Sequence, residues 1–129
     1  MLHKQQGILH QAREARIQIL GLSETHHSRF FPDADVREFS SMPEESASGG
    51  ASIIILDKSI TVLPEGVTSG YNFVLAPLSK DGIIFHVLVV YLSTTAEKAR
   101  QTIKETSYFI EMPNLIVLGD KNCIGPMPL

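Results

Sequence analysis

Residues 114–122 read N-L-I-V-L-G-D-K-N, a short apolar run that ends in a glycine, an acid, a lysine and an amide. The run Leu115–Leu118 is typical of a buried strand, because it is short, aliphatic and bounded by turn-forming residues. Alternation along an extended chain places Leu118, Asp120 and Asn122 on one face, so the acid and the amide project side by side. The same spacing is also typical of a solvated acid in a turn.

A second acid follows another apolar run, I-Q-I-L-G-L-S-E-T, at residues 17–25. Counting by twos places Leu22 and Glu24 on one face, with Glu24 just past the end of the strand. A hard divalent cation such as Mg²⁺ takes one or two carboxylates and otherwise water or phosphate oxygens. Glu24 and Asp120 from neighbouring strands would provide that ligand set, and Asn122 would orient a phosphate. Spacing alone leaves open whether these are ligands or solvated loop acids.

Tyr91 lies near the end of the longest apolar run, Ile83–Leu92, which predicts a central strand covered on both faces. The default interpretation of Tyr91 is a core tyrosine with its hydroxyl at the rim. His86 lies on the opposite face of the strand, and we expect a histidine with satisfied hydrogen bonds rather than a catalyst. His26 and His27 follow the first acid closely enough to reach the same rim, but surface histidines are common.

The remaining sequence predicts a mostly antiparallel sheet flanked by helices. Asp81 and Gly82 are typical of a two-residue hairpin turn. Thr94 and Glu97 form a capping box, which begins a helix that ends before Pro113. The expected strands are 17–22, 51–56, 60–63, 71–76, 83–92 and 114–118, with a first helix over 4–15 and a loop over 40–50. This order favours a layered α/β fold over a regular doubly wound one.

Size and composition set further limits. The 129 residues suit one domain, and the net charge of −3 provides no basic footprint for nucleic acid, although a metal-centred hydrolase can hold phosphate through its ion. The single cysteine, Cys123, excludes an internal disulfide framework and a multi-cysteine zinc site. The N-terminus lacks the apolar core of a signal peptide, and no apolar run is long enough to span a bilayer. We therefore expect an intracellular protein, nuclear or cytoplasmic.

Taken in order, four segments resemble the endonuclease/exonuclease/phosphatase superfamily, which shares the DNase I fold. Within this superfamily, the sequences of these segments are most similar to those of the endonuclease domains of non-LTR retrotransposons. The segments are I-Q-I-L-G-L-S-E-T-H-H (17–27), G-G-A-S-I-I-I-L (49–56), V-L-V-V-Y-L (87–92) and L-I-V-L-G-D-K-N-C-I (115–124). The resemblance covers nearly the whole chain in the family's order, and it implies a partial DNase I-like α/β sandwich.

The resemblance also implies roles for four residues. Glu24 matches the metal-binding glutamate of the family, and Tyr91 matches a strand-end tyrosine that contacts the scissile phosphate. Asp120 matches the aspartate that positions or activates the attacking water, and Asn122 matches an asparagine that supports the phosphate. The implied reaction is hydrolysis of a phosphodiester, dependent on Mg²⁺ or Mn²⁺, with DNA as the implied partner.

The chain departs from the family's pattern in several places. The family has an earlier strand with a metal-site asparagine, a later aspartate–asparagine pair and a final S-D-H, and none of these is found in the sequence. Lys121 stands where the family has an apolar residue, and L-S-T-T follows Tyr91 without the usual proline and asparagine. We therefore expect residues 1–129 to be a single truncated domain that is weak or inactive as a nuclease on its own.

Two alternatives stay open at this point. One is a non-catalytic interaction or dimerisation module, because a single sheet would leave an apolar face uncovered and available for self-association. The other is a phosphatase of the same superfamily that acts on a small phosphorylated substrate. The sequence S-E-T-H-H at residues 23–27 favours a nuclease over a phosphatase.

Overall fold

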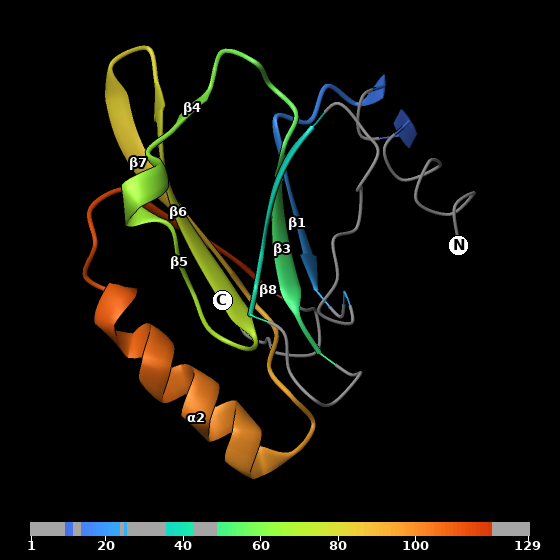
Figure 1. Cartoon of the computed structure of the whole chain (residues 1–129), viewed down its shortest axis with the longest axis vertical. Coiled ribbons are helices and arrows are strands. Elements are labelled where there is room, and N and C mark those ends of the chain that lie inside the picture. Colours follow the sequence, from blue (N-terminus) through green and yellow to red (C-terminus); the bar gives the residue numbers. More distant parts are fainter. Residues whose placement is uncertain (1–9, 12–13, 24, 26–35, 43–48, 120–129) are drawn as a thin grey trace.

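Two β-sheets pack face to face, and one α-helix covers the outer face of the larger sheet (Figure 1). This computed structural model describes residues 10–11, 14–23, 25, 36–42 and 49–119. No helix in these ranges is long and apolar enough to cross a membrane. Within the predicted first helix, the described residues His10, Gln11 and Glu14 are helical.

The smaller sheet has three strands in the order β1-β3-β2, and both pairings are antiparallel. Its strands are β1 (Ile19–Ser23), β2 (Arg37–Ser40) and β3 (Ala51–Ile55). The larger sheet has the order β4-β6-β7-β8, and β5 also pairs with β6. Its strands are β4 (Thr61–Val62), β5 (Thr68–Ser69), β6 (Phe73–Lys80), β7 (Ile83–Val90) and β8 (Leu115–Gly119). The helical segments are η1 (Pro64–Gly66), α2 (Ala96–Thr106) and η2 (Ser107–Phe109).

The predicted hairpin at Asp81 and Gly82 is confirmed. Both residues have positive φ, 53° and 80°, which the two central residues of a tight hairpin turn require. The hairpin pairs β6 with β7 along eight residues on each strand, from Phe73 opposite Val90 to Lys80 opposite Ile83. β7 then pairs in parallel with β8, so the chain must return to the starting end of the sheet between them, and α2 makes that crossover.

The predicted start of α2 is wrong by one residue. The N-cap is Thr95 and makes no side-chain capping bond, so the capping box expected at Thr94 and Glu97 does not form. Instead, the Ser93 hydroxyl accepts a hydrogen bond from the Thr95 backbone N–H at 3.0 Å. This local turn engages the Thr95 N–H in place of a capping box, and α2 begins directly after Thr95.

The side of α2 that faces the sheet carries threonines. Thr102 and Thr106 are buried, whereas Ile103 is 53% exposed. The threonine hydroxyls are accommodated because each donates back to a carbonyl four residues earlier, Thr102 to Lys98 at 3.1 Å and Thr106 to Thr102 at 2.9 Å. The helix therefore presents small polar side chains to the sheet and keeps isoleucine at its flank.

The main core lies between the two sheets. Its fully buried residues come from β3, β6, β7 and the turn after β3, namely Ala51, Ile53, Ile55, Ile60, Val74, Ala76, Leu78, Val87 and Val89. Gly21 of β1 allows the sheets to approach closely, because a Cβ atom there would lie 2.8 Å from Leu118 Cδ1 and 3.0 Å from Val89 Cγ2. Burial of this aliphatic surface is the dominant stabilising term.

The expectation of a single sheet with an uncovered apolar face is wrong. The inner faces of the two sheets cover each other through the core just described. The outer face of the larger sheet is covered by residues of η2 and its flanks, where Phe109 and Met112 pack on Phe73 and Leu88. On the outer face of the smaller sheet, Ile54 is 0% exposed. The predicted self-association through an uncovered sheet face is therefore not supported.

The turn after β3 is ordered by Asp57. Its Oδ1 accepts hydrogen bonds from the Ser59 backbone N–H at 2.8 Å and from the Ser59 hydroxyl at 2.7 Å. Its Oδ2 accepts one from Lys80 Nζ at 3.0 Å. These bonds to Ser59, and then the Lys80 ammonium, lower the pKa of Asp57 from 3.8 to about 2 because they favour the charged carboxylate.

A pH dependence of stability follows from this lowered pKa. Because the folded pKa of Asp57 lies below the unfolded value, its contribution is complete above pH 3.8 and is lost as pH falls towards 2. The Asp57→Asn variant is expected to show a smaller fall in urea midpoint over this window than the wild type. Urea titrations at several pH values measure the difference, and parallel pH profiles would contradict the assignment.

Candidate functional site

Several strands end together at one end of the sandwich. In the smaller sheet, Ser23 of β1 is opposite Ala51, and Ser40 of β2 is opposite Ser52. β1 and β2 therefore both end where β3 begins. Ser41, just past β2, lies at this rim against Ala51.

The larger sheet contributes two more strand ends to the same place. Val90 of β7 pairs with both Phe73 and Gly119, so β7 and β8 end where β6 begins. A hydrogen bond from the Gly50 backbone N–H to Asn72 Oδ1, at 3.1 Å, connects this end of the larger sheet to the start of β3. The ends of β1, β2, β7 and β8 thus form one rim.

Asn72 joins the segments that form the rim. It is only 6% exposed, and its side chain accepts the Gly50 N–H while its own carbonyl accepts the Tyr91 backbone N–H at 2.8 Å. Tyr91 follows β7 directly and is 8% exposed. The predicted burial of Tyr91 is confirmed, and its contact with a phosphate stays a prediction. Asn72 has no signature in the sequence beyond its place just before β6.

Buried and half-buried hydroxyl groups lie beside Asn72. The Ser40 and Ser52 hydroxyl oxygens are 2.9 Å apart, and the Ser41 hydroxyl accepts the Ala51 backbone N–H at 2.9 Å. Thr25, just past β1, is 4% exposed. The rim is therefore polar beneath its surface, and its groups are held by hydrogen bonds between strands that are distant in the sequence.

The chain enters β3 through two glycines in the left-handed region. Gly49 and Gly50 have φ of 91° and 97°, a conformation that side chains with a Cβ rarely adopt. This conformation directs the Gly50 N–H to Asn72. The sequence predicts only a loop here. The two adjacent glycines are the one local indication that the backbone adopts positive φ before β3.

Three of the four predicted site residues, Glu24, Asp120 and Asn122, lie outside the described residues. Glu24 comes directly after Ser23, the last residue of β1, and Asp120 directly after Gly119, the last residue of β8. Both of these strands end at the rim. Among the described residues, no group of three or more histidine, cysteine or acidic side chains could hold a metal ion. The roles of Glu24, Asp120 and Asn122 stay predictions.

His86 lies away from the rim. Its Nδ1 is 3.1 Å from the Pro113 carbonyl oxygen, and it pairs with Leu115, at the start of β8. The prediction of a histidine with satisfied hydrogen bonds is confirmed, although His86 is half-buried rather than in the core. His26, His27 and Cys123 lie outside the described residues.

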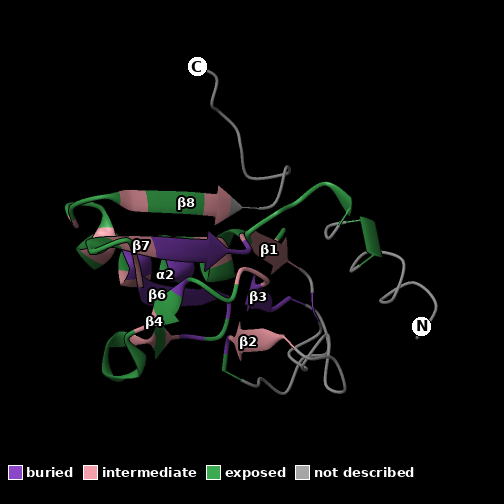
Figure 2. Cartoon of the chain, turned by 90° about the horizontal axis from the view of Figure 1, so that it is seen from above, coloured by how far each residue is buried: buried purple, intermediate pink, exposed green. Residues whose placement is uncertain are grey.

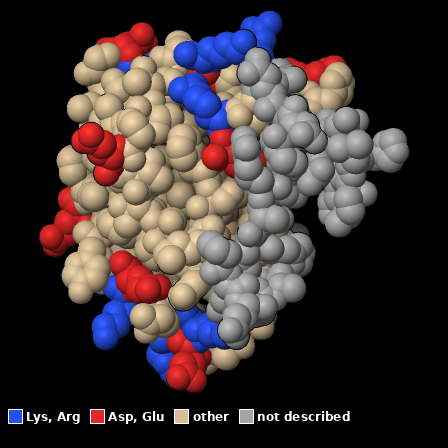
Figure 3. Space-filling view, in the orientation of Figure 1, with Lys and Arg blue, Asp and Glu red and all other residues tan. Residues whose placement is uncertain are grey.

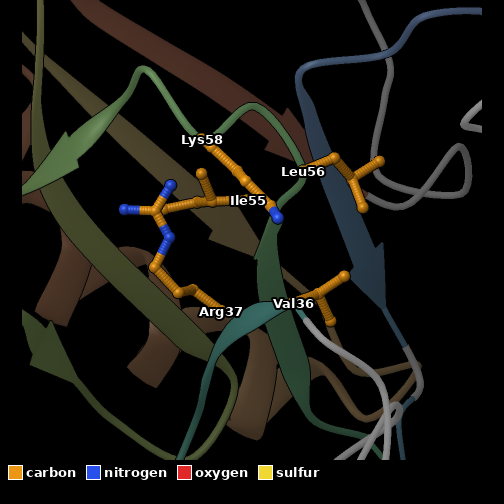
Figure 4. Close-up of a pocket in the computed structure, with 5 residues that line it drawn as sticks. All are labelled: Val36, Arg37, Ile55, Leu56 and Lys58. Atoms are coloured by element: carbon orange, nitrogen blue, oxygen red, sulfur yellow. The ribbon is translucent and has the colours of Figure 1, made fainter.

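A hollow lies at the end of the smaller sheet opposite the rim (Figure 4). It has a volume of about 330 Å³ and is lined by Val36, Arg37, Ile55, Leu56 and Lys58. The Arg37 guanidinium donates to the carbonyl oxygens of Ile60 at 2.6 Å and Asp57 at 2.9 Å. Arg37 thereby ties β2 to the turn after β3, and its role is structural.

Replacement of Asn72 tests whether its hydrogen bond to Gly50 stabilises the rim. Asn72→Ala would leave the buried Gly50 N–H without its acceptor, and we expect a loss of about 1–3 kcal/mol in the free energy of unfolding. Urea denaturation measures the loss. Tyr71→Ala is the control, because Tyr71 is adjacent but 48% exposed, and it should change stability by less than about 0.5 kcal/mol. Equal losses would contradict the role of Asn72.

Comparisons with known proteins find the same fold at low sequence identity. No protein-family model and no curated protein matches the sequence. The endonuclease domain of TRAS1, a telomere-specific non-LTR retrotransposon, matches with a TM-score of 0.68 and 20% identity, over 91% of this chain and 52% of that one. The catalytic domain of human Nocturnin, solved with a bound sulfate anion, matches with 0.67 and 15%, over 96% and 58%.

A third solved structure, D. rerio TDP2 in complex with a single-strand DNA product, matches with a TM-score of 0.65 and 14% identity, over 94% of this chain and 54% of that one. The chain thus spans about half the length of the solved structures that it matches. At these identities the likeness establishes the fold. The fold is a partial DNase I-like α/β sandwich, as the resemblance implies.

Proposed function

We propose that this chain carries metal- and phosphate-binding elements of a Mg²⁺-dependent phosphodiesterase that acts on nucleic acid. The observation that carries the proposal is the shared rim: β1 and β8, which directly precede Glu24 and Asp120, end at the same end of a nuclease-type sandwich. Two of the solved structures with this fold are an endonuclease domain and a protein in complex with a DNA product.

The resemblance implies Mg²⁺ or Mn²⁺ at this rim. The described hydroxyl and amide oxygens there, from Ser41, Ser52 and Asn72, already take part in hydrogen bonds between segments, so the ligands would come from the acids that follow β1 and β8. Hard cations take oxygen ligands, and Mg²⁺ usually needs only one or two carboxylates from the protein. Glu24 would hold the ion, with Asp120 near it. When bound, the ion would supply Lewis-acid stabilisation of charge on the phosphoryl oxygens.

The other predicted residues would act on the phosphate and the water. Tyr91, whose backbone is fixed by Asn72, would contact the scissile phosphate from the end of β7. Asp120 would orient or activate the attacking water, and Asn122 would support the phosphate through its amide. Residues that follow the ends of paired strands would be held in place, and in-line attack on a phosphate requires such positioning.

We further propose that residues 1–129 alone are a weak or inactive nuclease. The sequence contains five histidines, and none belongs to an S-D-H motif of the kind that the resemblance links to catalysis. A missing general acid–base group lowers the rate by about 10²–10⁴-fold. In this proposal, residues 1–129 supply the side chains that contact the metal and the phosphate. They lack the histidine that would transfer the proton.

Charge supports weak binding of nucleic acid. The net charge is −3, and in Figure 3 the acidic and basic side chains lie around the margin of a broad uncharged area. With a net negative charge, contacts with phosphate would depend on the bound ion, and counterion release would contribute little. From the single cysteine we propose a reducing compartment, the nucleus or the cytoplasm.

The metal site can be tested without any activity. Titration calorimetry with Mn²⁺ on the purified chain is expected to show binding that Glu24→Gln or Asp120→Asn weakens at least about tenfold, equivalent to about 1.4 kcal/mol. Glu65→Gln is the matched control, because Glu65 is an exposed acid on η1, away from the rim, and it should leave the affinity unchanged. Binding that Glu65→Gln weakens as much as Glu24→Gln would rule out the proposed site.

Activity is tested by nicking of supercoiled plasmid in the presence of Mg²⁺. We expect slow nicking or none by the wild-type chain, and any nicking should be lost in Glu24→Ala and Asp120→Ala. Rapid cutting that both substitutions abolish would refute the weak-activity part of the proposal and support the assigned site. Cutting that neither substitution affects would refute the assigned site.

A further inference from the structure

The turn that connects β5 to β6 lies at the rim, because β6 begins where β7 and β8 end. Figure 2 shows that β7 and β8 point the same way. The Gly70 backbone N–H donates to the Phe73 carbonyl at 3.1 Å, next to the pairing of β5 with β6. Tyr71 and Asn72 are therefore the two residues of a tight turn at the rim.

The backbone of this turn is fixed on both sides of Tyr71. The Gly70 carbonyl accepts the Met42 backbone N–H at 2.7 Å, which ties the turn to the segment after β2. On the other side, Asn72 is bonded to the start of β3 and to the residue after β7. Three segments that are distant in the sequence thus hold the two residues that flank Tyr71.

Tyr71 is exposed although the residues beside it are fixed. It is 48% exposed, whereas Asn72 is 6% exposed. Met42, which is bonded to the same turn, is 44% exposed. A tyrosine has only two side-chain torsions, so ordering its ring against a ligand costs little conformational entropy. The rim therefore carries an exposed aromatic residue whose backbone is ordered before any ligand binds.

An aromatic ring at this place suits a nucleobase. Every base has a π-face, and the stacking of a base on an aromatic side chain tolerates any sequence. The net charge of −3 leaves little affinity from counterion release, so contacts other than charge must contribute to binding. In a duplex the base faces are covered by their neighbours, whereas the bases of an unpaired strand can turn outward. The chemistry of this turn therefore favours a single-stranded segment.

Tyr71 also lies close to the predicted phosphate contact. The Asn72 carbonyl accepts the Tyr91 N–H at 2.8 Å, so Tyr71 is one residue away from a direct partner of Tyr91. Standard backbone lengths then place the Cα atoms of Tyr71 and Tyr91 within about 11 Å of each other. Phosphates along one DNA strand are spaced by about 3.4 Å of helix axis. A base within a few nucleotides of a phosphate held by Tyr91 is therefore at the right distance for Tyr71.

We propose that Tyr71 is a positioning residue that stacks on an unpaired nucleobase near the phosphate held at the rim. The inference rests on the proposed function and deepens it, because it names single-stranded nucleic acid as the substrate class. Stacking on Tyr71 orders the strand across the rim, and Met42 provides an adaptable apolar contact beside it. Neither residue takes part in metal binding or in proton transfer.

Fluorescence anisotropy with a labelled single strand of oligothymidylate, at fixed salt and with Mg²⁺, tests the stacking. We expect Tyr71→Ala to weaken binding at least about fivefold. Tyr71→Phe and Tyr71→Trp should keep the wild-type affinity, because the ring and not the hydroxyl makes the contact. Tyr108→Ala is the matched control, because Tyr108 is 80% exposed on η2, which packs on the outer face of the larger sheet. No binding by the wild type, or equal effects of Tyr71→Ala and Tyr108→Ala, would overturn the proposal.

Abasic and duplex versions of the strand separate stacking from contacts with phosphate. An abasic strand keeps the phosphates and lacks the bases, so Tyr71→Ala and the wild type should bind it equally. The wild type should bind a duplex more weakly than the single strand. A loss of affinity for the abasic strand in Tyr71→Ala, or a preference of the wild type for the duplex, would show that Tyr71 does not act by stacking.

Titration with Mn²⁺ distinguishes this inference from the proposed metal site. Tyr71→Ala should bind Mn²⁺ with the wild-type affinity, and this result also shows that the variant is folded. Mn²⁺ binding that depends on Glu24, together with equal strand affinities of the wild type and Tyr71→Ala, would overturn the stacking alone. Strand binding that depends on Tyr71, without Mn²⁺ binding, would refute the metal site and support the stacking.

Discussion

Replacement of Ile53 with alanine is expected to lower the free energy of unfolding by about 2–5 kcal/mol. Ile53 is 0% exposed on the inner face of β3, between the two sheets. Truncation removes three buried carbon atoms and leaves a cavity between the sheets, which the close-packed neighbours fill only in part. Because small domains are stable by about 5–15 kcal/mol, the variant would lose a large part of its stability.

Urea denaturation followed by circular dichroism measures this effect. Ile83→Ala is the matched control, with the same chemical change at a residue that is 62% exposed, and it should cost less than about 0.5 kcal/mol. If Ile53→Ala does not fold, Ile53→Val should still lose about 0.5–1.5 kcal/mol. Similar losses at positions 53 and 83 would show that the space between the sheets is not the main core.

Replacement of Phe73 with alanine is expected to cost about 3–5 kcal/mol. Phe73 begins β6 and is 5% exposed, and its ring centroid lies 5.7 Å from that of Phe109 with the planes tilted by 53°. This ring pair holds η2, and with it the end of α2, against the outer face of the larger sheet. The substitution removes both the buried area and the aromatic contact.

Two measurements separate this role from a general loss of stability. The free energy of unfolding should fall by the stated amount, and hydrogen exchange of the α2 amides should accelerate more than exchange in β3. Tyr108→Ala is the control, because Tyr108 is next to Phe109 but 80% exposed. A uniform acceleration throughout the molecule would contradict the specific role of Phe73 in holding the helix.

The strands could be predicted from the sequence to the extent that their patterns are local. β7 is apolar on both faces and follows a two-residue turn, so its position and its partner β6 are both evident from adjacent residues. Periodicity alone does not predict the division into two sheets, because it identifies apolar faces and not strand partners, and the sandwich is implied only by the resemblance. β2 is four residues long, R-E-F-S, and acquires its strand structure by pairing with β3.

The candidate site, too, could be predicted only where the relevant sequence pattern is local. Burial of Tyr91 follows from its place at the end of β7, and the sequence predicts it. The part played by Asn72 depends on contacts with Gly50 and Tyr91, which lie far away in the sequence, and no local pattern indicates such contacts. Glu24 and Asp120 were identified through a resemblance, and the structure describes the strands before them rather than the acids themselves.

The hairpin turn at Asp81 and Gly82 also bears on how the chain can assemble. Pairing β6 with β7 closes a loop of two residues, whereas pairing β1 with β3 closes the whole segment between Ser23 and Ala51. The entropy lost on loop closure grows with the logarithm of loop length, by about 0.6 kcal/mol for each doubling. The larger ordering cost therefore falls on the three-stranded sheet, and the hairpin is the part of the sandwich that can form with the least help from the rest.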